Sequence, residues 1–278
     1  MSIAYYNGRF QTLEEVKIPL TDRALFFGDG VYEALIARNN IAHFADRHFE
    51  RFFTNAKVLG INVGLSANEL DDLIKEALLL ANEETATVYF QLTKYSETRI
   101  HACPITDRSN LLITVTPQTA PSPEKRTKLV SYPDLRYRYC NLKTLNLLPS
   151  VIASEYAARQ GADEAVLHRG ETVTECAKSN ISIISGGILY THPNCELILP
   201  GIMRRALLEE CANLGIPKRE EAFTLSDLFS AEAVLVTGST KICAIAESVD
   251  GREFEKESPQ AILLCKKLHE NFIKMTTK

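Results

Sequence analysis

Apolar positions in the first half of the chain alternate between a period of two and a period close to 3.6. Strands are predicted where the runs are short and rich in β-branched and aromatic residues, at 31–36, 87–93 and 111–115. Helices are predicted at 45–59 and from 66 to about 80, where apolar residues recur at helical spacing. Ser66 and Glu69 have the spacing of a capping box, which predicts where the second helix begins.

Two short turns predict antiparallel pairing in this half. Asn7-Gly8 separates Ala-Tyr-Tyr at 4–6 from Arg-Phe-Gln at 9–11, and Asn and Gly both tolerate the positive φ of a tight hairpin. Asn39-Asn40 separates 31–36 from a second run at 41–44 in the same way. The first half should therefore be a mixed α/β domain.

The second half repeats short strands and helices after a proline-rich stretch at 117–123. Proline is disfavoured inside helices and sheets, so this stretch predicts a linker. We expect an N-terminal domain at 1–116, a linker at 117–126 and a C-terminal domain at 127–278. Strands are predicted at 127–132, 164–167, 172–174, 181–184, 188–191 and 234–237, helices at 148–159, 203–214 and 259–275, and a hairpin around 250–251.

Composition narrows the class of protein. The 278 residues are 45% hydrophobic, enough for two globular cores, and the formal charge of -4 gives no basic footprint for nucleic acid. The seven cysteines form no Cys-x-x-Cys pair, which argues against a disulfide framework or a zinc site and favours a reducing cytoplasm. The sequence has neither a secretory leader pattern nor a long apolar run, so we expect a cytoplasmic protein without metal or membrane contact.

Lys143 is the only charged residue in the segment from Tyr139 to Leu148. A lysine kept from water loses stability in its ammonium form, so its pKa falls from about 10.4 toward a neutral, nucleophilic amine. Such an amine forms a Schiff base with an aldehyde. The ordinary alternative is an exposed lysine at the edge of a helix or strand, since lysines are rarely buried.

Four further places carry candidate chemistry. Arg99 and His101 lie two positions apart in a long polar loop at 94–110, where they could meet one anion or remain solvated. Glu175 ends a predicted strand, a position where acids are usually on the surface. The segments 199–202 and 237–240 run from apolar residues into a helix start or a turn of small residues, whose N–H groups could bind phosphate.

Together these motifs resemble the fold-type-IV pyridoxal-phosphate enzymes, and the likeness covers essentially the whole chain. It rests on Lys143 in Leu-Lys-Thr-Leu-Asn, on 173–175 with 179–180, on Leu-Pro-Gly-Ile at 199–202 and on Thr-Gly-Ser-Thr at 237–240. Within that family, 27–33, His48 with Arg51, and above all Arg-Ile-His at 99–101 resemble the bacterial D-amino-acid aminotransferases. The resemblance implies an α/β (α+β) fold, with a smaller N-terminal α/β domain and a larger C-terminal pseudo-barrel α/β domain.

The resemblance also implies a role for each matching residue and a homodimer as the working unit. Lys143 would bind the aldehyde of pyridoxal 5'-phosphate and move the proton of the substrate α-carbon, and Glu175 would face the pyridine nitrogen. In the dimer, the partner subunit would supply Arg99 and His101. The other implied cofactor residues are Arg51, Asn180, Leu199, Ile202, Met203, Ser239 and Thr240, and the implied substrate residues are Tyr32, Arg99, His101 and Tyr137.

The sequence departs from this pattern at Ala177, Lys178 and Met203, where relatives tend to have small hydroxyl residues. The resemblance therefore does not determine the affinity for the cofactor, and the Lys178 side chain could approach the phosphate or point outward. Two related activities also fit Lys143 and Glu175: aminodeoxychorismate lyase, which forms 4-aminobenzoate, and branched-chain L-amino-acid aminotransferase. The Arg-x-His pair favours transamination between D-amino acids and 2-oxo acids. A non-enzymatic scaffold would leave the lysine idle, and nothing in the sequence favours it.

Overall fold

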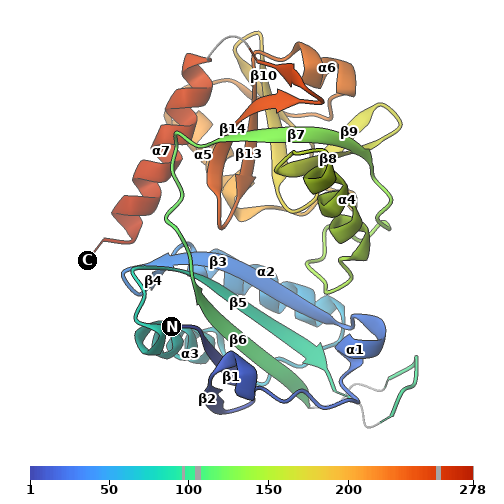
Figure 1. Cartoon of the computed structure of the whole chain (residues 1–278), viewed down its shortest axis with the longest axis vertical. Coiled ribbons are helices and arrows are strands. Elements are labelled where there is room, and N and C mark those ends of the chain that lie inside the picture. The colour runs from blue at the N-terminus through green and yellow to red at the C-terminus, as the bar shows by residue number, and fades with distance from the viewer. Residues whose placement is uncertain (96–97, 104–107, 255–257, 278) are drawn as a thin grey trace. The chain divides into compact units, whose positions relative to one another are not determined.

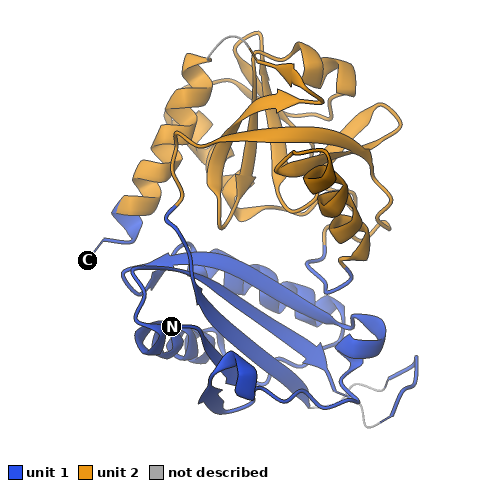
Figure 2. Ribbon diagram, viewed as in Figure 1, with its two compact units in different colours: residues 1–120, 142–146, 274–278 blue, residues 121–141, 147–273 orange. Residues whose placement is uncertain are grey.

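The computed structural model describes residues 1–95, 98–103, 108–254 and 258–277 (Figure 1). The chain forms two compact units (Figure 2). Unit 1 contains Met1–Ala120, Leu142–Asn146 and Lys274–Lys278, and unit 2 contains Pro121–Asn141 and Leu147–Ile273. The short segment that carries Lys143 thus groups with the N-terminal residues rather than with those that flank it. The predicted loop at 94–110 lies partly outside the described residues.

Unit 1 is an antiparallel six-stranded sheet with strand order β2-β1-β6-β5-β3-β4. Its strands are β1 (Ile3–Tyr6), β2 (Arg9–Gln11), β3 (Gly30–Arg38), β4 (Ile41–Ala42), β5 (Thr85–Lys94) and β6 (Ser109–Pro117). The 3-10 turn η1 (Leu13–Glu15) and the helices α1 (Arg23–Phe27), α2 (Ala45–Val58) and α3 (Ala67–Ala81) complete it. The apolar stripes of α2 and α3 pack against the sheet to form one core, which includes Phe52, Phe90, Leu35 and Ile74.

Local sequence explains the turns and helix starts of unit 1. Asn7, Gly8, Asn39 and Asn40 all have positive φ, as predicted for the two hairpins. The Ser66 backbone N–H donates to Glu69 Oε2 at 2.7 Å, and the Glu69 N–H donates to Ser66 Oγ at 3.3 Å, so the predicted capping box is confirmed. The predicted strand at 41–44 is too long, because β4 contains only two residues.

Unit 2 is built on a curled mixed sheet of nine strands, in the order β12-β11-β10-β13-β14-β7-β8-β9, with β15 paired to β14 (Figure 1). The strand β7 runs parallel to both β14 and β8. The strands are β7 (Arg126–Pro133), β8 (Glu164–Arg169), β9 (Thr172–Cys176), β10 (Asn180–Ser185), β11 (Ile188–Thr191), β12 (Lys218–Glu220), β13 (Ala233–Gly238), β14 (Ile242–Val249) and β15 (Arg252–Glu253).

The helices of unit 2 are α4 (Leu148–Arg159), α5 (Ile202–Asn213), α6 (Leu225–Ser230) and α7 (Pro259–Met275). The predicted helices 148–159 and 259–275 are confirmed at both ends, and the one at 203–214 is confirmed with a shift of one residue. No helix within the described residues is long and apolar enough to cross a membrane. With the two mixed units, the predicted α/β (α+β) class is confirmed.

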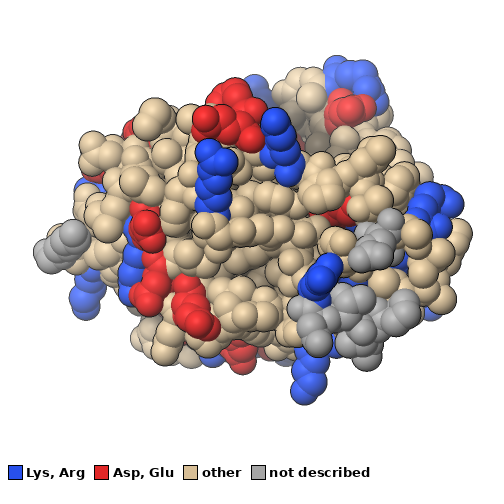
Figure 3. Space-filling view, turned by 90° about the horizontal axis from the view of Figure 1, so that it is seen from below, with Lys and Arg blue, Asp and Glu red and all other residues tan. Residues whose placement is uncertain are grey.

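Charge is distributed over the surface without a basic stripe on the face shown in Figure 3. Lysine and arginine side chains of the described residues are scattered there among acidic and uncharged ones. On that face, the described residues do not form the clustered cations by which proteins bind a phosphate backbone.

Candidate functional site

The Lys143 segment is held beside β3 in unit 1. The Tyr32 N–H donates to the Lys143 carbonyl oxygen at 3.0 Å, and the Leu145 N–H donates to the Gly30 carbonyl oxygen at 3.1 Å. Thr144 forms an antiparallel bridge with Val31, so the segment adds a few strand-like residues to the sheet. The lysine is half-buried. Backbone pairing therefore fixes the place from which the Lys143 side chain extends.

An aromatic pair lies next to this lysine. The Lys143 ammonium nitrogen is 4.1 Å from the centroid of the Tyr32 ring, within the range of a cation–π contact. Tyr32 in turn stacks on Tyr89 at a centroid distance of 5.5 Å. The Tyr89 hydroxyl donates to Gln91 Oε1 at 2.6 Å, which fixes the outer ring. Two residues predicted from the sequence, Lys143 and Tyr32, are thus in direct contact.

Arg51 is held by a buried acid of the neighbouring strand. Its Nε and Nη2 atoms donate to the two carboxylate oxygens of Glu33 at 2.7 and 2.8 Å, and His48 Nδ1 lies 2.7 Å from the same carboxylate. Burial alone would raise the pKa of Glu33, but Arg51 and His48 more than offset it and hold that pKa at about 2. Glu33 therefore stays ionised and orients Arg51.

The Arg99 and His101 side chains meet on one ring of α1. The guanidinium carbon of Arg99 is 5.1 Å from the Phe27 ring centroid, and the His101 ring centroid is also 5.1 Å away. Both residues are exposed, and Arg99 has no carboxylate partner among the described residues. The Arg99 guanidinium and the His101 imidazole thus both contact the Phe27 ring, an arrangement in which they could bind one anion together.

Glu175, at the end of β9 in unit 2, is buried and surrounded by donors. Its carboxylate accepts from Asn180 Nδ2 at 2.9 Å and from the Leu199 N–H at 3.1 Å, and it forms an ion pair with Arg136. The Asn180 amide also donates to the Leu199 carbonyl oxygen at 2.9 Å. Three predicted residues, Glu175, Asn180 and Leu199, are therefore joined in one network.

Burial raises the pKa of Glu175 to about 7, although the Arg136 guanidinium favours the ionised form. Arg136 is shared with a second carboxylate, since its Nε and Nη2 atoms both donate to Asp134 at 2.9 Å. Asp134 also accepts from the Thr174 hydroxyl at 3.0 Å and pairs with Arg169 at 3.1 Å. The arrangement leaves Glu175 able to gain or lose a proton near neutral pH.

The start of α5 presents backbone donors beside this network. Gly201 is the N-cap, and no side chain of the described residues caps the helix, so the Ile202 and Met203 N–H groups lack partners within the helix. A Cβ on Gly201 would lie 1.8 Å from Asn180 Oδ1, so only glycine allows this close approach. The helix start has the donors and partial positive charge of an anion site.

The turn that contains Ser239 and Thr240 connects β13 to β14. Lys241, at its end, pairs with Glu164 at 2.8 Å, and the same buried carboxylate accepts from Ser179 Oγ at 3.0 Å and from the Lys178 N–H at 2.9 Å. Glu164 thereby joins the turn before β10 to the turn before β14. The Lys178 side chain is exposed.

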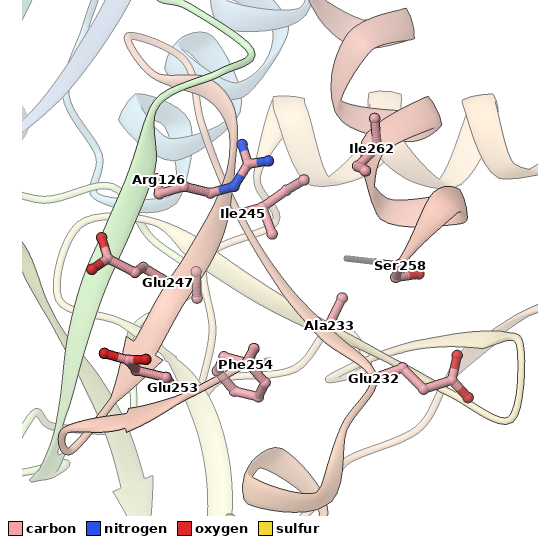
Figure 4. A pocket seen from close by; sticks show the side chains of 10 residues that line it. Arg126, Glu232, Ala233, Ile245, Glu247, Glu253, Phe254, Ser258 and Ile262 are labelled. Atoms are coloured by element: carbon pink, nitrogen blue, oxygen red, sulfur yellow. The ribbon is translucent and has the colours of Figure 1, made fainter. Parts of the chain in front are cut away.

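A pocket of about 200 Å³ in unit 2 is lined by other residues (Figure 4). Arg126, Glu232, Glu247 and Ile262 are among its lining residues, and none of the described residues that line it is a predicted site residue. The described residues also contain no cluster of His, Cys, Asp and Glu that could hold a metal ion. We assign the pocket no part in the chemistry.

Several residues of these networks were missed in the sequence. The sequence did not predict a role for these four residues, because the contacts of each depend on partners that are distant in the chain. They are Glu33, Asp134, Arg136 and Glu164. The Arg136–Glu175 pair, for example, is separated by 39 positions. One indication was available at Glu33, the single charged residue in the apolar run at 31–36, since a lone charge in a buried strand needs a partner. The remaining predicted residue, Tyr137, is exposed.

Comparison with known proteins identifies relatives over most of the chain. A family model described as "Amino-transferase class IV" matches residues 30–249. A "D-alanine aminotransferase" of Staphylococcus haemolyticus is 34% identical over 257 residues, which is 91% of this chain and 91% of that protein. This relative therefore aligns with the chain over nearly the full length of both proteins.

Solved structures have the same fold at lower identity. A branched-chain aminotransferase of the archaeon Thermoproteus uzoniensis, determined with norvaline, superposes with a TM-score of 0.88 at 22% identity, covering 98% of this chain and 95% of its own. A protein of Legionella pneumophila described as a candidate 4-amino-4-deoxychorismate lyase gives 0.86 at 25% identity, covering 93% and 97%.

Proposed function

The chain belongs to the class IV amino-transferases, and from this membership we propose that it moves the amino group of a D-amino acid to a 2-oxo acid. Enzymes of this family depend on pyridoxal 5'-phosphate, so the chain is a pyridoxal-phosphate-dependent aminotransferase. Its substrates are amino acids and 2-oxo acids. D-Alanine and 2-oxoglutarate are the reference pair, with pyruvate and D-glutamate as products.

One observation carries the choice of D-amino acids. The curated relatives at 32–34% identity are named D-alanine aminotransferases, and each aligns with at least 90% of this chain. The branched-chain and lyase structures described above match at 22% and 25% identity. The contacts of Arg99 and His101 with Phe27 support the same choice, because they keep a guanidinium and an imidazole together for a carboxylate.

The predicted cofactor residues have the chemistry that the cofactor requires. Glu175 has a pKa of about 7 and suits a basic ring nitrogen, and the uncapped N–H groups of Ile202 and Met203 suit a phosphate. Ser239 and Thr240 offer hydroxyls, and Arg51 offers a guanidinium oriented by Glu33. When bound, pyridoxal 5'-phosphate supplies an electron sink for the bonds of the substrate α-carbon.

The protein side chains then divide the work. Lys143 would hold the cofactor aldehyde through its amine and would carry the proton of the substrate α-carbon, while the Tyr32 ring contacts the lysine from one side. Glu175 would face the ring nitrogen and favour its protonated form, and Asn180 and the Leu199 N–H keep that carboxylate in place. Tyr32, Arg99 and His101 would bind the substrate carboxylate, and Tyr137 and Leu199 would pack near the ring.

We also propose that the working form is a cytoplasmic homodimer, in which Arg99 and His101 serve the partner's site. The outward residues Leu148, Val151 and Ile152 of α4 support a second copy, since a helix seldom leaves three large aliphatic side chains uncovered. All seven cysteines are free thiols, as a reducing compartment favours. Sedimentation at micromolar concentration should give a dimer, and a monomer would contradict the proposal.

The domain organisation is proposed on the same basis. Two domains, 1–116 and 127–278, joined by a linker at 117–126, agree with the proline-rich composition of that stretch. Limited proteolysis should cut first within 117–126 and leave two fragments. Resistance of that stretch with cleavage elsewhere would contradict this organisation.

A substrate screen tests the function directly. The holoenzyme should transfer the amino group of D-alanine to 2-oxoglutarate, with D-glutamate resolved by chiral chromatography, and L-alanine or L-leucine should react at least about a hundredfold more slowly. Aminodeoxychorismate should yield no 4-aminobenzoate. Preference for the L-amino acids would favour the branched-chain activity, and release of 4-aminobenzoate would favour the lyase. A purified protein that binds no cofactor, without the visible absorbance of a lysine Schiff base, would indicate a scaffold.

A further inference from the structure

The segment that carries Arg99 and His101 is attached to α1 through its backbone. Two nitrogen atoms of the Arg23 guanidinium donate to successive carbonyl groups, Nη1 to the Ile100 oxygen and Nη2 to the His101 oxygen, the latter at 3.1 Å. A planar guanidinium can reach two such acceptors at once, whereas a lysine ammonium is a single point on a flexible stem. Arg23 thus binds the main chain of this segment and leaves the Arg99 and His101 side chains available.

Arg23 is itself fixed. Its side chain is buried, with 5% of the residue exposed, and its Nε donates to Asp29 at 2.7 Å. The guanidinium carbon also lies 4.7 Å from the Phe27 ring centroid. Phe27 is the ring that Arg99 and His101 contact, so backbone and side chains of the segment are both anchored to α1.

The helix α1 is joined to the strands on both sides of the 94–110 loop. Asp22, its N-cap, accepts from the Ala24 N–H at 2.8 Å through one oxygen. Its other oxygen accepts from the Thr93 hydroxyl at 2.6 Å and from Asn110 Nδ2 at 2.7 Å, near the end of β5 and the start of β6 (Figure 1). These bonds hold the start of α1 to β5 and β6 of unit 1.

We propose that Arg23, held by Asp29, is a positioning residue for substrate binding, which fixes the Arg99–His101 segment at the spacing that a carboxylate requires. The inference rests on the proposed function, in which Arg99 and His101 bind the substrate carboxylate. Arg23 makes no contact with substrate in this account. It acts on affinity for amino and oxo acids through the main chain of the segment.

The test is a double-mutant cycle with Arg23→Lys and Arg99→Ala. Arg23→Lys keeps the charge beside Asp29 but loses the paired bonds to the carbonyls, and it should raise the KM for D-alanine about five- to tenfold at nearly constant kcat. Arg99→Ala should raise it about 10- to 100-fold. In the double variant, Arg23→Lys should add less than about twofold, because residues that act through one another are not additive.

Arg38→Lys is the matched control. Arg38 is also in unit 1 and pairs with Glu84 at 3.3 Å, and it takes no part in the proposed site. The control should leave KM and kcat unchanged. Asp29→Asn provides a second route, since it releases Arg23 while retaining the guanidinium, and it should raise KM by a few-fold. That variant decides the question if Arg23→Lys does not fold.

The outcomes separate this inference from the function on which it rests. An unchanged KM in Arg99→Ala would contradict the proposed carboxylate site. A raised KM in Arg99→Ala with an unchanged KM in Arg23→Lys or Asp29→Asn would overturn the positioning role alone. A fully additive double variant, or a loss of kcat and visible cofactor absorbance in Arg23→Lys, would also overturn it, because Arg23 would then support the fold rather than substrate affinity.

Discussion

Two buried glutamates, one in each unit, differ in what their surroundings do to them. Glu33 in unit 1 is 0% exposed and Glu175 in unit 2 is 5% exposed, and each pairs with an arginine. Nevertheless, the pKa of Glu33 is about 2 and that of Glu175 is about 7. Burial raises both values, so the difference comes from the donors that oppose it.

The arginines are shared differently. Arg51 gives two nitrogen atoms to Glu33, and His48 adds a third contact to the same carboxylate. Arg136 gives two of its nitrogen atoms to Asp134 and only one to Glu175. A second carboxylate near the same guanidinium also raises the pKa of Glu175 directly. The protonation state of a buried glutamate therefore depends on the other partners of its arginine as well as on the ion pair itself.

The two roles follow from this difference. Glu33 stays ionised throughout the physiological range and serves as an anchor for Arg51. Glu175 can hold or release a proton near neutral pH, which suits a residue that would face a basic ring nitrogen. Replacing Glu33 should therefore change mainly the free energy of unfolding, and replacing Glu175 should change mainly the turnover rate.

Replacing Glu175 should have the largest effect on activity. Glu175→Gln keeps the size of the side chain but cannot carry the charge that favours a protonated ring nitrogen, so kcat should fall by about two to four orders of magnitude. The fold and cofactor binding should persist. Steady-state kinetics with D-alanine measure the effect, and Glu171→Gln, on the exposed turn before β9, is the control. Turnover within twofold of wild type would show that the acid lies elsewhere.

Replacing Glu33 should have the largest effect on stability. Glu33→Gln leaves Arg51 and His48 without their anionic partner in a buried place, and we expect a loss of about 3 to 5 kcal/mol in the free energy of unfolding. Urea denaturation of the apoprotein measures it. Glu84→Gln removes an exposed Glu–Arg pair of the same unit, whose acid is 73% exposed, and should cost less than about 1 kcal/mol. Equal losses of unfolding free energy in Glu33→Gln and Glu84→Gln would show that the buried ion pair contributes no more to stability than the exposed one.

Much of the fold was predictable because its determinants are local. Asn-Gly and Asn-Asn pairs, the Ser66 capping box and long amphipathic stripes each act within a few residues, and they predicted most strands and helices. The missed elements η1, α1, β12 and α6 have three, five, three and six residues, too short for a period to be read. A capping box at Thr224 was nevertheless available for α6.

The candidate site was predictable only where a motif carries it. Lys143, Glu175 and the Arg99–His101 pair stand in recognisable short patterns. Arg23 and Asp134 do not, because their contacts join positions 78 and 40 residues apart, at His101 and Thr174. Periodicity and propensity contain no information about such pairs, which form only when the sheet brings the strands together.

Removing the competing carboxylate should make Glu175 resemble Glu33. Asp134→Asn retains polar atoms for Arg136 and Thr174 but removes a negative charge, so the pKa of Glu175 should fall by about one unit or more. NMR titration of glutamate labelled at its carboxyl carbon in the apoprotein can follow it. Asp71→Asn, which removes the half-buried acid paired with the exposed Lys75 in unit 1, is the control and should leave the titration unchanged. A constant or higher pKa in Asp134→Asn would contradict the account of shared arginines.

The two glutamates should also give opposite contributions to stability as pH changes. Glu175 has a folded pKa above its unfolded value of about 4.5, so its contribution is lost as pH rises from about 4.5 to 7, by roughly 1 to 3 kcal/mol. Glu33 has a folded pKa below that value, so its contribution is lost as pH falls from about 4.5 to 2. Urea denaturation of wild type and Glu175→Gln between pH 4.5 and 7 should show the steeper decline in wild type. If the unfolding free energies of wild type and Glu175→Gln changed in parallel with pH, the raised pKa assigned to Glu175 would be contradicted.

The central claim is that Lys143 moves the α-proton of a D-amino acid, and hydrogen exchange measures this step. In D₂O, with holoenzyme and a little pyruvate, the proton NMR signal of the D-alanine α-hydrogen should disappear while that of L-alanine remains. Lys143→Ala, with cofactor bound, should leave both signals intact, because no other group is assigned to carry that proton. Exchange of L-alanine at the same rate, or continued exchange of D-alanine in Lys143→Ala, would contradict the account.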